Sequence, residues 1–333
     1  MDLAWANVID LAFSPGDVAR VRFAYSHLWE LSESLRVLTG PGGSALHIPW
    51  VRAVRPRLRA GDFPMLRALT RPFGYIVDFL TPPPTTPLPD LPAELDAVRN
   101  TPPDVVCAEI LQYLKVHRIA PVPDALRPLL DTPEAALPRL VDELVAYWDA
   151  ALADVWPRLS ALLEGDVLRR SRRLTTGGAA ALFADLHPAV CWTGDRLRID
   201  HAWDGGERLD GRGLLLVPGV FCWPDVRVLV GGSYQPGVLY PAAGVATLWE
   251  QAPPPPPGAL GTLLGGTRAA VLAGLDEPAS PTELARRLDV TPGAISQHLG
   301  ILRDAGLVTP HRTGRHVRYS RTPLGNALAG RPT

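Results

Sequence analysis

The chain has few of the features that mark secreted, disulfide-bonded or membrane-spanning proteins. Its 333 residues include only three cysteines, which lie far apart at Cys107, Cys191 and Cys222. This spacing predicts buried thiols in a reducing compartment rather than a disulfide framework. The best apolar run, 214–223, is interrupted by Pro218 and is too short to span a bilayer. Asp2 and Asp10 lie near the N-terminus without a basic start, so we expect no secretory signal, a cytoplasmic location and no membrane partner.

Lysine is almost absent, since Lys115 is the only one among 33 lysine and arginine residues. Arginine is thus the default cation of the chain, and its abundance alone does not indicate nucleic-acid binding. Its distribution is more informative. Residues 258–333 carry nine arginines against five acidic residues, a net charge of +4, whereas the rest of the chain carries −5. A basic end on an acidic body is typical of a polyanion-binding module attached to something else.

Motifs of known catalytic and cofactor sites are missing as well. There is no G-x-S-x-G, phosphate-binding loop or dinucleotide fingerprint. Asp200, His201 and Asp204 come nearest to a metal or acid–base cluster, but neighbours along a strand point to opposite faces and cannot all converge. Four aromatic residues that could line a pocket are interpreted as core: Trp192, Trp203, Phe221 and Trp223. We therefore expect no enzyme activity, no catalytic residues, no metal and no cofactor.

Five consecutive prolines at 253–257 mark the predicted domain boundary, because such a run can neither continue a helix nor join a sheet. The charge changes sign at the same place. Before it, a short alternating strand at 7–13 precedes a helix start at Ser14, and further apolar periodicities predict helices as far as about residue 180. Short β-type runs between Gly, Asp and Pro turns follow. We therefore expect an N-terminal region over 1–252, helical over 1–180 and β-rich over 181–252, and a C-terminal domain over 258–333.

The C-terminal domain contains two helix starts in close succession. Ser280 can cap a helix, Pro281 fits its first turn, and Glu283 completes a capping box. Thr291 and Pro292 repeat the start signal almost at once. Two helices with so short a connection must cross steeply, which predicts a helix-turn-helix.

The second of these helices separates an apolar face from a small polar one. At about 100° per residue, Leu299 and Leu302 fall on the side of Ile295. Small side chains on the other side can approach a groove closely, and Gln297 can pair bidentately with adenine. His298 lies at the edge between the two faces. Its side chain could there contact a phosphate or make a structural hydrogen bond. The predicted DNA-contacting residues of this helix are Thr291, Gly293, Ser296, Gln297, His298 and Arg303.

A basic hairpin follows. Two strand-like runs flank a turn at Thr313 and Gly314. On the return strand, Val317 and Tyr319 are expected to face the core, and His316 and Arg318 to face outward. A positively charged ribbon beside the second helix is a wing that can meet phosphates or the minor groove. The predicted wing contacts are Arg312, Arg315 and Arg318.

Three motifs in order, T-R-A-A-V-L-A-G-L, T-E-L-A-R-R-L-D-V-T-P-G-A-I-S-Q-H-L-G-I-L-R-D-A-G-L-V and R-T-G-R-H-V-R-Y, resemble the ArsR-type winged helix regulators. The resemblance covers about 70 residues and implies a homodimeric repressor that reads a near-palindromic operator. The closely spaced cysteines of arsenic-sensing members are absent from 281–288, so metal sensing by that route is not expected. The earlier motif Y-W-D-A-A-L-A-D-V-W-P-R resembles the long N-terminal region of actinobacterial regulators of this kind. That region has no assigned activity, so the resemblance implies none for this chain.

These observations predict an α+β protein with a large mixed N-terminal domain and a C-terminal winged helix-turn-helix. We expect a dimeric, DNA-binding transcription regulator with double-stranded DNA as partner. Its N-terminal region would sense an unknown small-molecule effector or mediate dimerisation. Two alternatives stay open: a small-molecule-binding or enzymatic N-terminal domain tethered to DNA, and a protein-interaction module without an effector.

Overall fold

The computed structural model of the chain describes residues 7–40, 45–59, 61–87, 90–231, 234–249, 258–313 and 316–329. Its contacts divide the chain into two compact units. The first, called the body, comprises Met1–Trp156 and Arg170–Ala242, and the second, the C-terminal unit, comprises Pro157–Arg169 and Ala243–Thr333. The proline run at 253–257 lies outside the described residues, so the domain division that was based on it stays a prediction. Helices and sheets are mixed in the chain, which confirms the α+β class.

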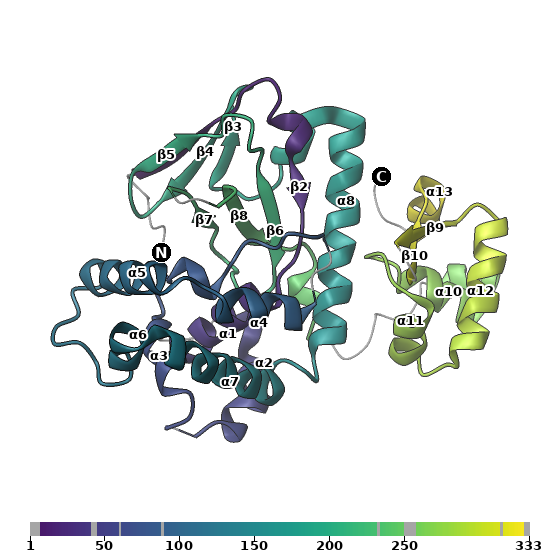
Figure 1. The fold of residues 1–333 in the computed structure, drawn as a ribbon. Helices are drawn as coiled ribbons and strands as arrows, with labels where there is room; N and C mark the ends of the chain where they lie inside the picture. Colours follow the sequence, from purple (N-terminus) through teal and green to yellow (C-terminus); the bar gives the residue numbers. More distant parts are fainter. Residues whose placement is uncertain are drawn as a thin grey trace. The chain divides into compact units, whose positions relative to one another are not determined.

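Helices dominate the first part of the body (Figure 1). They are α1 (His27–Thr39), α2 (Ile48–Val54), α3 (Pro64–Leu69), α4 (Leu91–Arg99), α5 (Pro103–Val116), α6 (Arg127–Asp131), α7 (Pro133–Ala151) and α8 (Trp156–Phe183), of which Arg170 onward belongs to the body. No helix among the described residues is long and apolar enough to cross a membrane.

The first long helix begins later than the sequence indicated. Ser14 does not cap it, because Asp17 accepts hydrogen bonds from the Ser14 amide (2.7 Å) and the Gly213 amide (2.9 Å) and so closes a turn. The cap is Ser26, whose hydroxyl accepts from the Trp29 amide at 3.1 Å. The residues just before that cap instead form a short strand that pairs with a distant strand of the body.

Two four-stranded sheets complete the body, with orders β3-β4-β1-β5 and β2-β6-β8-β7. Their strands are β1 (Asn7–Ala12), β2 (Arg22–Phe23), β3 (Val190–Trp192), β4 (Arg196–His201), β5 (Gly205–Arg208), β6 (Leu215–Gly219), β7 (Arg227–Leu229) and β8 (Gly237–Pro241). The strand predicted at 7–13 is confirmed. It joins the later strands by antiparallel pairing with β4, with Ile9 opposite Ile199.

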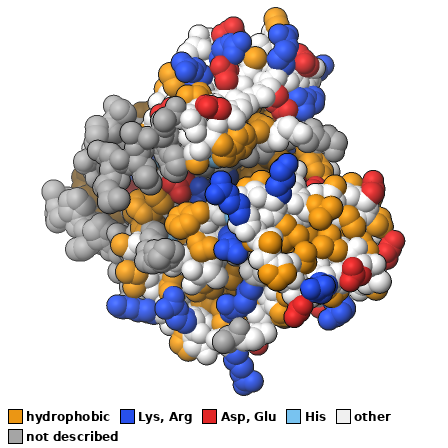
Figure 2. Space-filling model, turned by 90° about the vertical axis from the view of Figure 1, so that its left-hand side faces the viewer, with side chains coloured by type: hydrophobic (Ala, Val, Ile, Leu, Met, Phe, Trp, Pro, Cys, Tyr) orange, Lys and Arg blue, Asp and Glu red, His pale blue; other side chains and the backbone are white. Residues whose placement is uncertain are grey.

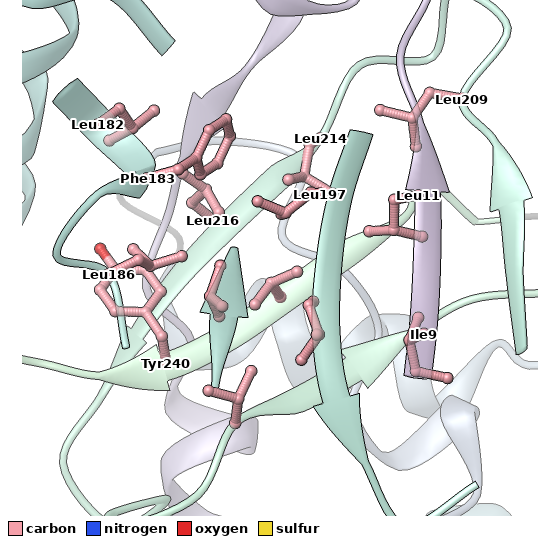
Figure 3. Close-up of a cluster of buried hydrophobic side chains, with 14 residues drawn as sticks. Ile9, Leu11, Leu182, Phe183, Leu186, Leu197, Leu209, Leu214, Leu216 and Tyr240 are labelled. Atoms are coloured by element: carbon pink, nitrogen blue, oxygen red, sulfur yellow. The ribbon is translucent and has the colours of Figure 1, made fainter. Parts of the chain in front are cut away.

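A shared core fills the space between the two sheets and the end of α8. Alternate residues of β1, Ile9 and Leu11, are fully buried, as the period of a strand requires. They meet Leu197 from β4, Leu216 from β6 and Phe183 from α8 (Figure 3). The first and the last parts of the body's sequence therefore both contribute to this apolar core.

The C-terminal unit has its own core. Its elements are α9 (Gly258–Leu264), α10 (Gly266–Ala273), α11 (Pro281–Leu288), α12 (Pro292–Asp304), β9 (Val308–Thr313), β10 (His316–Arg321) and α13 (Pro323–Leu328). Fully buried apolar residues from α10, α11 and α12, among them Leu272, Leu284 and Ile295, form that core. Tyr319 of β10 packs against it and exchanges backbone hydrogen bonds with Ala279 at 2.8 and 3.0 Å.

A buried carboxylate from α4 holds the start of α1. Glu94 accepts hydrogen bonds from the Ser26 hydroxyl (2.7 Å) and from the His27 (3.1 Å) and Leu28 (2.9 Å) amides.

We expect Glu94→Ala to lower the free energy of unfolding by about 2 kcal/mol or more, because these buried donors would lose their partner. Urea unfolding followed by circular dichroism measures the change. Glu134→Ala, at an exposed position of α7, is the control, and equal midpoints for the two variants would contradict the assignment.

Candidate nucleic-acid interface

The two helix starts seen in the sequence form a helix-turn-helix. The Ser280 hydroxyl accepts from the Glu283 amide at 3.3 Å, and the Glu283 carboxylate accepts from the Ser280 amide at 2.8 Å, which confirms the capping box. Asp289 ends α11 in the left-handed region, with φ of 54°. The Thr291 hydroxyl then caps α12 by accepting from the Ala294 amide at 3.4 Å. Local hydrogen bonds thus close one helix and open the next within three residues.

The faces of α12 are sorted as its sequence predicts. Ile295, Leu299 and Leu302 are buried in the core of the C-terminal unit. A side chain added at Gly293 or Gly300 would meet no atom within 4 Å. The other side of the helix is thus free of packing by described residues. Five of the predicted DNA-contacting residues are exposed at or along α12: Thr291, Gly293, Ser296, Gln297 and Arg303.

His298 differs from these five. It is half-buried, and its Nδ1 atom is inaccessible to solvent and has no hydrogen-bond partner among the described residues. Arg303 is exposed but pairs with its neighbour Asp304, with 2.8 Å between Nη2 and the carboxylate. That contact raises the pKa of Arg303 above its ordinary value. The guanidinium is thus a charged surface group whose ion-pair partner is the neighbouring Asp304.

The hairpin after α12 is present, and β9 and β10 pair in antiparallel register with Thr313 opposite His316. Arg312 on β9 is exposed, as expected of a wing contact. Arg315 lies outside the described residues, so its predicted contact with DNA stays untested. Tyr319 faces the core, as the alternation along β10 predicted.

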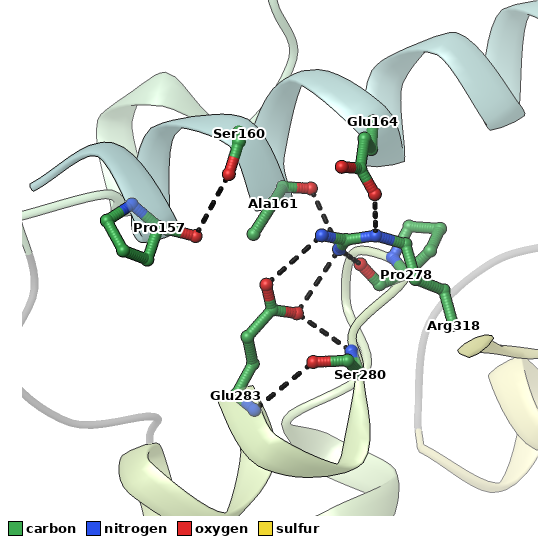
Figure 4. Close-up of polar contacts among 8 residues, drawn as sticks. All are labelled: Pro157, Ser160, Ala161, Glu164, Pro278, Ser280, Glu283 and Arg318. Carbon is green, nitrogen blue, oxygen red and sulfur yellow. Dashed lines mark hydrogen bonds and ion pairs between the residues drawn. The ribbon is translucent and has the colours of Figure 1, made fainter. Parts of the chain in front are cut away.

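The other face of β10 was expected to be exposed to solvent, but Arg318 on that face is buried. The residue is only 7 % exposed. Its Nη2 and Nη1 atoms lie 3.1 and 3.2 Å from the Glu283 carboxylate, and Nε donates to Glu164 of α8 (Figure 4). Nη1 also donates to the carbonyl oxygens of Ala161 and Pro278, each at 3.0 Å. A guanidinium held by two carboxylates and two carbonyls is a structural group and is not presented for a phosphate.

The physical reason for this correction is the start of α8, whose residues 157–169 belong to the C-terminal unit. These residues of α8 cover the face of β10 that would otherwise be exposed to solvent. Arg321 is also turned inward, where it pairs with Asp276 and donates to the Leu272 carbonyl at 3.3 Å. Among the described wing arginines, Arg312 alone is exposed. Sequence reasoning missed Glu164 and Ala161, and no local pattern marks them, since Glu164 precedes Arg318 by 154 positions.

We expect Arg318→Ala to lower the free energy of unfolding by about 3 kcal/mol, because it leaves the Glu283 carboxylate buried without its cation. Arg312→Ala is the matched control on the paired strand and should change stability by less than about 0.5 kcal/mol. Adding Glu283→Gln to Arg318→Met should recover part of the loss, since Glu283, the more deeply buried of the two carboxylates, then carries no unpaired charge. Chemical unfolding of the full chain measures all variants, and an Arg318→Ala protein as stable as the Arg312→Ala protein would contradict the structural role.

Comparisons with known protein families find matches at two places in the chain, of which the C-terminal one agrees with this geometry. A family model described as a helix-turn-helix domain matches residues 263–311, and a model described as a family of unknown function (DUF5937) matches residues 116–246. Comparison with curated proteins and with solved structures gives no match. The chain thus carries a helix-turn-helix domain, which is typical of DNA-binding regulators, beside a region similar to a family whose role is not established.

Proposed function

We propose that the chain is a transcription regulator that binds duplex DNA by placing α12 in the major groove. The observation that carries this proposal is the open face of α12, where the exposed Ser296 and Gln297 lie beside two glycines with free space above them. Short side chains let a helix come close to base edges, and a glutamine amide pairs bidentately with adenine. The helix-turn-helix match over residues 263–311 supports the same role.

Phosphate contacts in this proposal come from exposed cations at both ends of the surface. Arg303 lies in the last turn of α12 and Arg312 on β9. Arg318 supports the wing from behind instead of touching DNA. One arginine fewer than the three predicted wing contacts then faces the phosphates, so binding should depend less steeply on salt than three wing arginines would produce.

We further propose that the regulator is a homodimer that represses from a near-palindromic operator. The resemblance to ArsR-type regulators supports this assembly, since two-fold symmetric proteins read two-fold symmetric sites. The body would then act as an effector-sensing part rather than as an enzyme.

Gly300→Ala tests the groove contact because its two effects should have opposite signs. Alanine stabilises a helix interior by roughly 0.5 to 1 kcal/mol relative to glycine, and no described atom obstructs it. We expect a higher melting temperature and a lower DNA affinity. Gly261→Ala in α9, which is equally unobstructed, should stabilise the protein without weakening DNA binding. If Gly300→Ala kept full affinity, α12 would not approach DNA closely on this face.

Specific and non-specific contacts can be separated with two further variants. Gln297→Ala should reduce discrimination at one base position by about 1 to 3 kcal/mol, whereas Arg312→Ala should weaken binding to all sequences and lower the salt dependence by about one phosphate contact. Footprinting on the DNA upstream of the chain's own gene identifies the site, and fluorescence anisotropy at several salt concentrations measures affinity. A Gln297→Ala protein with unchanged base preference would show that α12 does not read that position.

A further inference from the structure

A cleft of about 570 Å³ lies within the body. Its walls come from α1, the segment 73–81, α5, β7, β8 and the chain around the end of β4. Figure 2 shows the side of the body on which α5 lies, where hydrophobic side chains gather with charged ones between them. Clefts of this volume accommodate a drug-sized organic molecule.

Aromatic and aliphatic side chains make most of the lining. Phe73 is 68 % and Trp203 43 % exposed, although both are large and apolar. Behind them, Trp29 and Leu239 are buried and form part of the same lining. Large apolar groups left open around a cleft are typical of a binding site, because a protein without a ligand there gains nothing from keeping them in water.

Four of the charged groups in the cleft neutralise one another. Glu33 lies 3.6 Å from Arg36 and 3.4 Å from Arg227, and Arg227 lies 3.2 Å from Asp225. These two guanidinium groups and two carboxylates form one chain of ion pairs along the wall. They hold α1 against β7 and leave no net charge of their own.

Two further carboxylates in the lining, Asp78 and Asp200, have no arginine partner among the described residues. Asp200 is exposed. Burial and the neighbouring Glu109 raise the pKa of Asp78 to about 7, although a hydrogen bond with Tyr75 opposes the shift. With the ion-paired groups balanced, the cleft carries an excess of two negative charges when both carboxylates are ionised.

We propose that this cleft binds a small amphipathic organic cation. Its apolar part would lie against Trp29, Trp203 and Phe73, where aromatic faces also attract positive charge, and its charged group would lie toward Asp78 and Asp200. Asp200 and His201, examined in the sequence as a catalytic or metal cluster, thereby belong to a binding site. Asp204 does not, because its carboxylate accepts from the Val8 amide at 2.9 Å. Binding of a cation in this cleft does not depend on the proposed function. Only the further view, that this ligand is the effector of the regulator, rests on it.

Tetraphenylphosphonium and tetraphenylborate provide the test, since they have nearly the same shape and opposite charge. Each is titrated into the full chain without DNA, and binding is followed by tryptophan fluorescence and by calorimetry. We expect saturable binding of the phosphonium ion, tighter than that of the borate by about tenfold or more, as one favourable charge contact near a surface allows. Equal affinities, a preference for the borate, or no saturable binding of either ion would overturn the proposal.

Variants locate the site. Asp78→Asn together with Asp200→Asn should reduce phosphonium affinity about tenfold and leave borate affinity unchanged or higher. Asp195→Asn, an exposed aspartate of the same sheet region outside the cleft, is the matched control. Trp203→Ala should weaken both ions, because it removes apolar contact. Loss of phosphonium preference in the control variant, or its persistence in the double variant, would place the cation elsewhere. Because no DNA is present, this outcome is independent of whether the chain binds an operator.

Discussion

A single guanidinium, that of Arg318, holds the C-terminal unit in its shape. Arginine carries five donors in a rigid plane, and here they meet the carboxylates of Glu283 and Glu164 and two backbone carbonyls. Glu283 is at the same time the capping-box residue of α11. The return strand of the wing is therefore tied to the first turn of the helix-turn-helix and to the start of α8. Because these charges are buried, each depends on the others for its stability.

The same interaction changes the character of the proposed DNA-binding surface. The net charge of +4 on residues 258–333 predicts a dense cationic ribbon, yet Arg318 and Arg321 are neutralised inside the unit. In the proposed function, the open face of α12 would then matter more for recognition, and the exposed Arg303 and Arg312 would provide its phosphate contacts. Sequence preference would come from the base contacts of the helix, because phosphate contacts position a protein without reading the sequence.

The body presents a different problem, since nothing in its sequence marks a site. Its cleft forms because α1, α5 and the strands around β7 meet, and each contributes two or more lining residues. α8 contributes residues to both units, and its first part provides the Glu164 that holds Arg318. A ligand that changes the equilibrium of the body would have to favour one arrangement of the chain over another before it could alter DNA binding.

What the sequence alone determined was local. The capping box at Ser280, the turn at Asp289, the apolar face of α12 and the pairing of β9 with β10 were all predicted, because each depends on residues a few positions apart. The alternation of β10 was also predicted correctly, but what lies against its second face was not. That depended on Glu164 and Ala161, and the late start of α1 likewise depended on Gly213 and on strand pairing far along the chain. Only the tertiary structure could decide these points, because the energy of burying a charge or closing a cleft depends on which distant residues meet there, and no local pattern encodes that meeting.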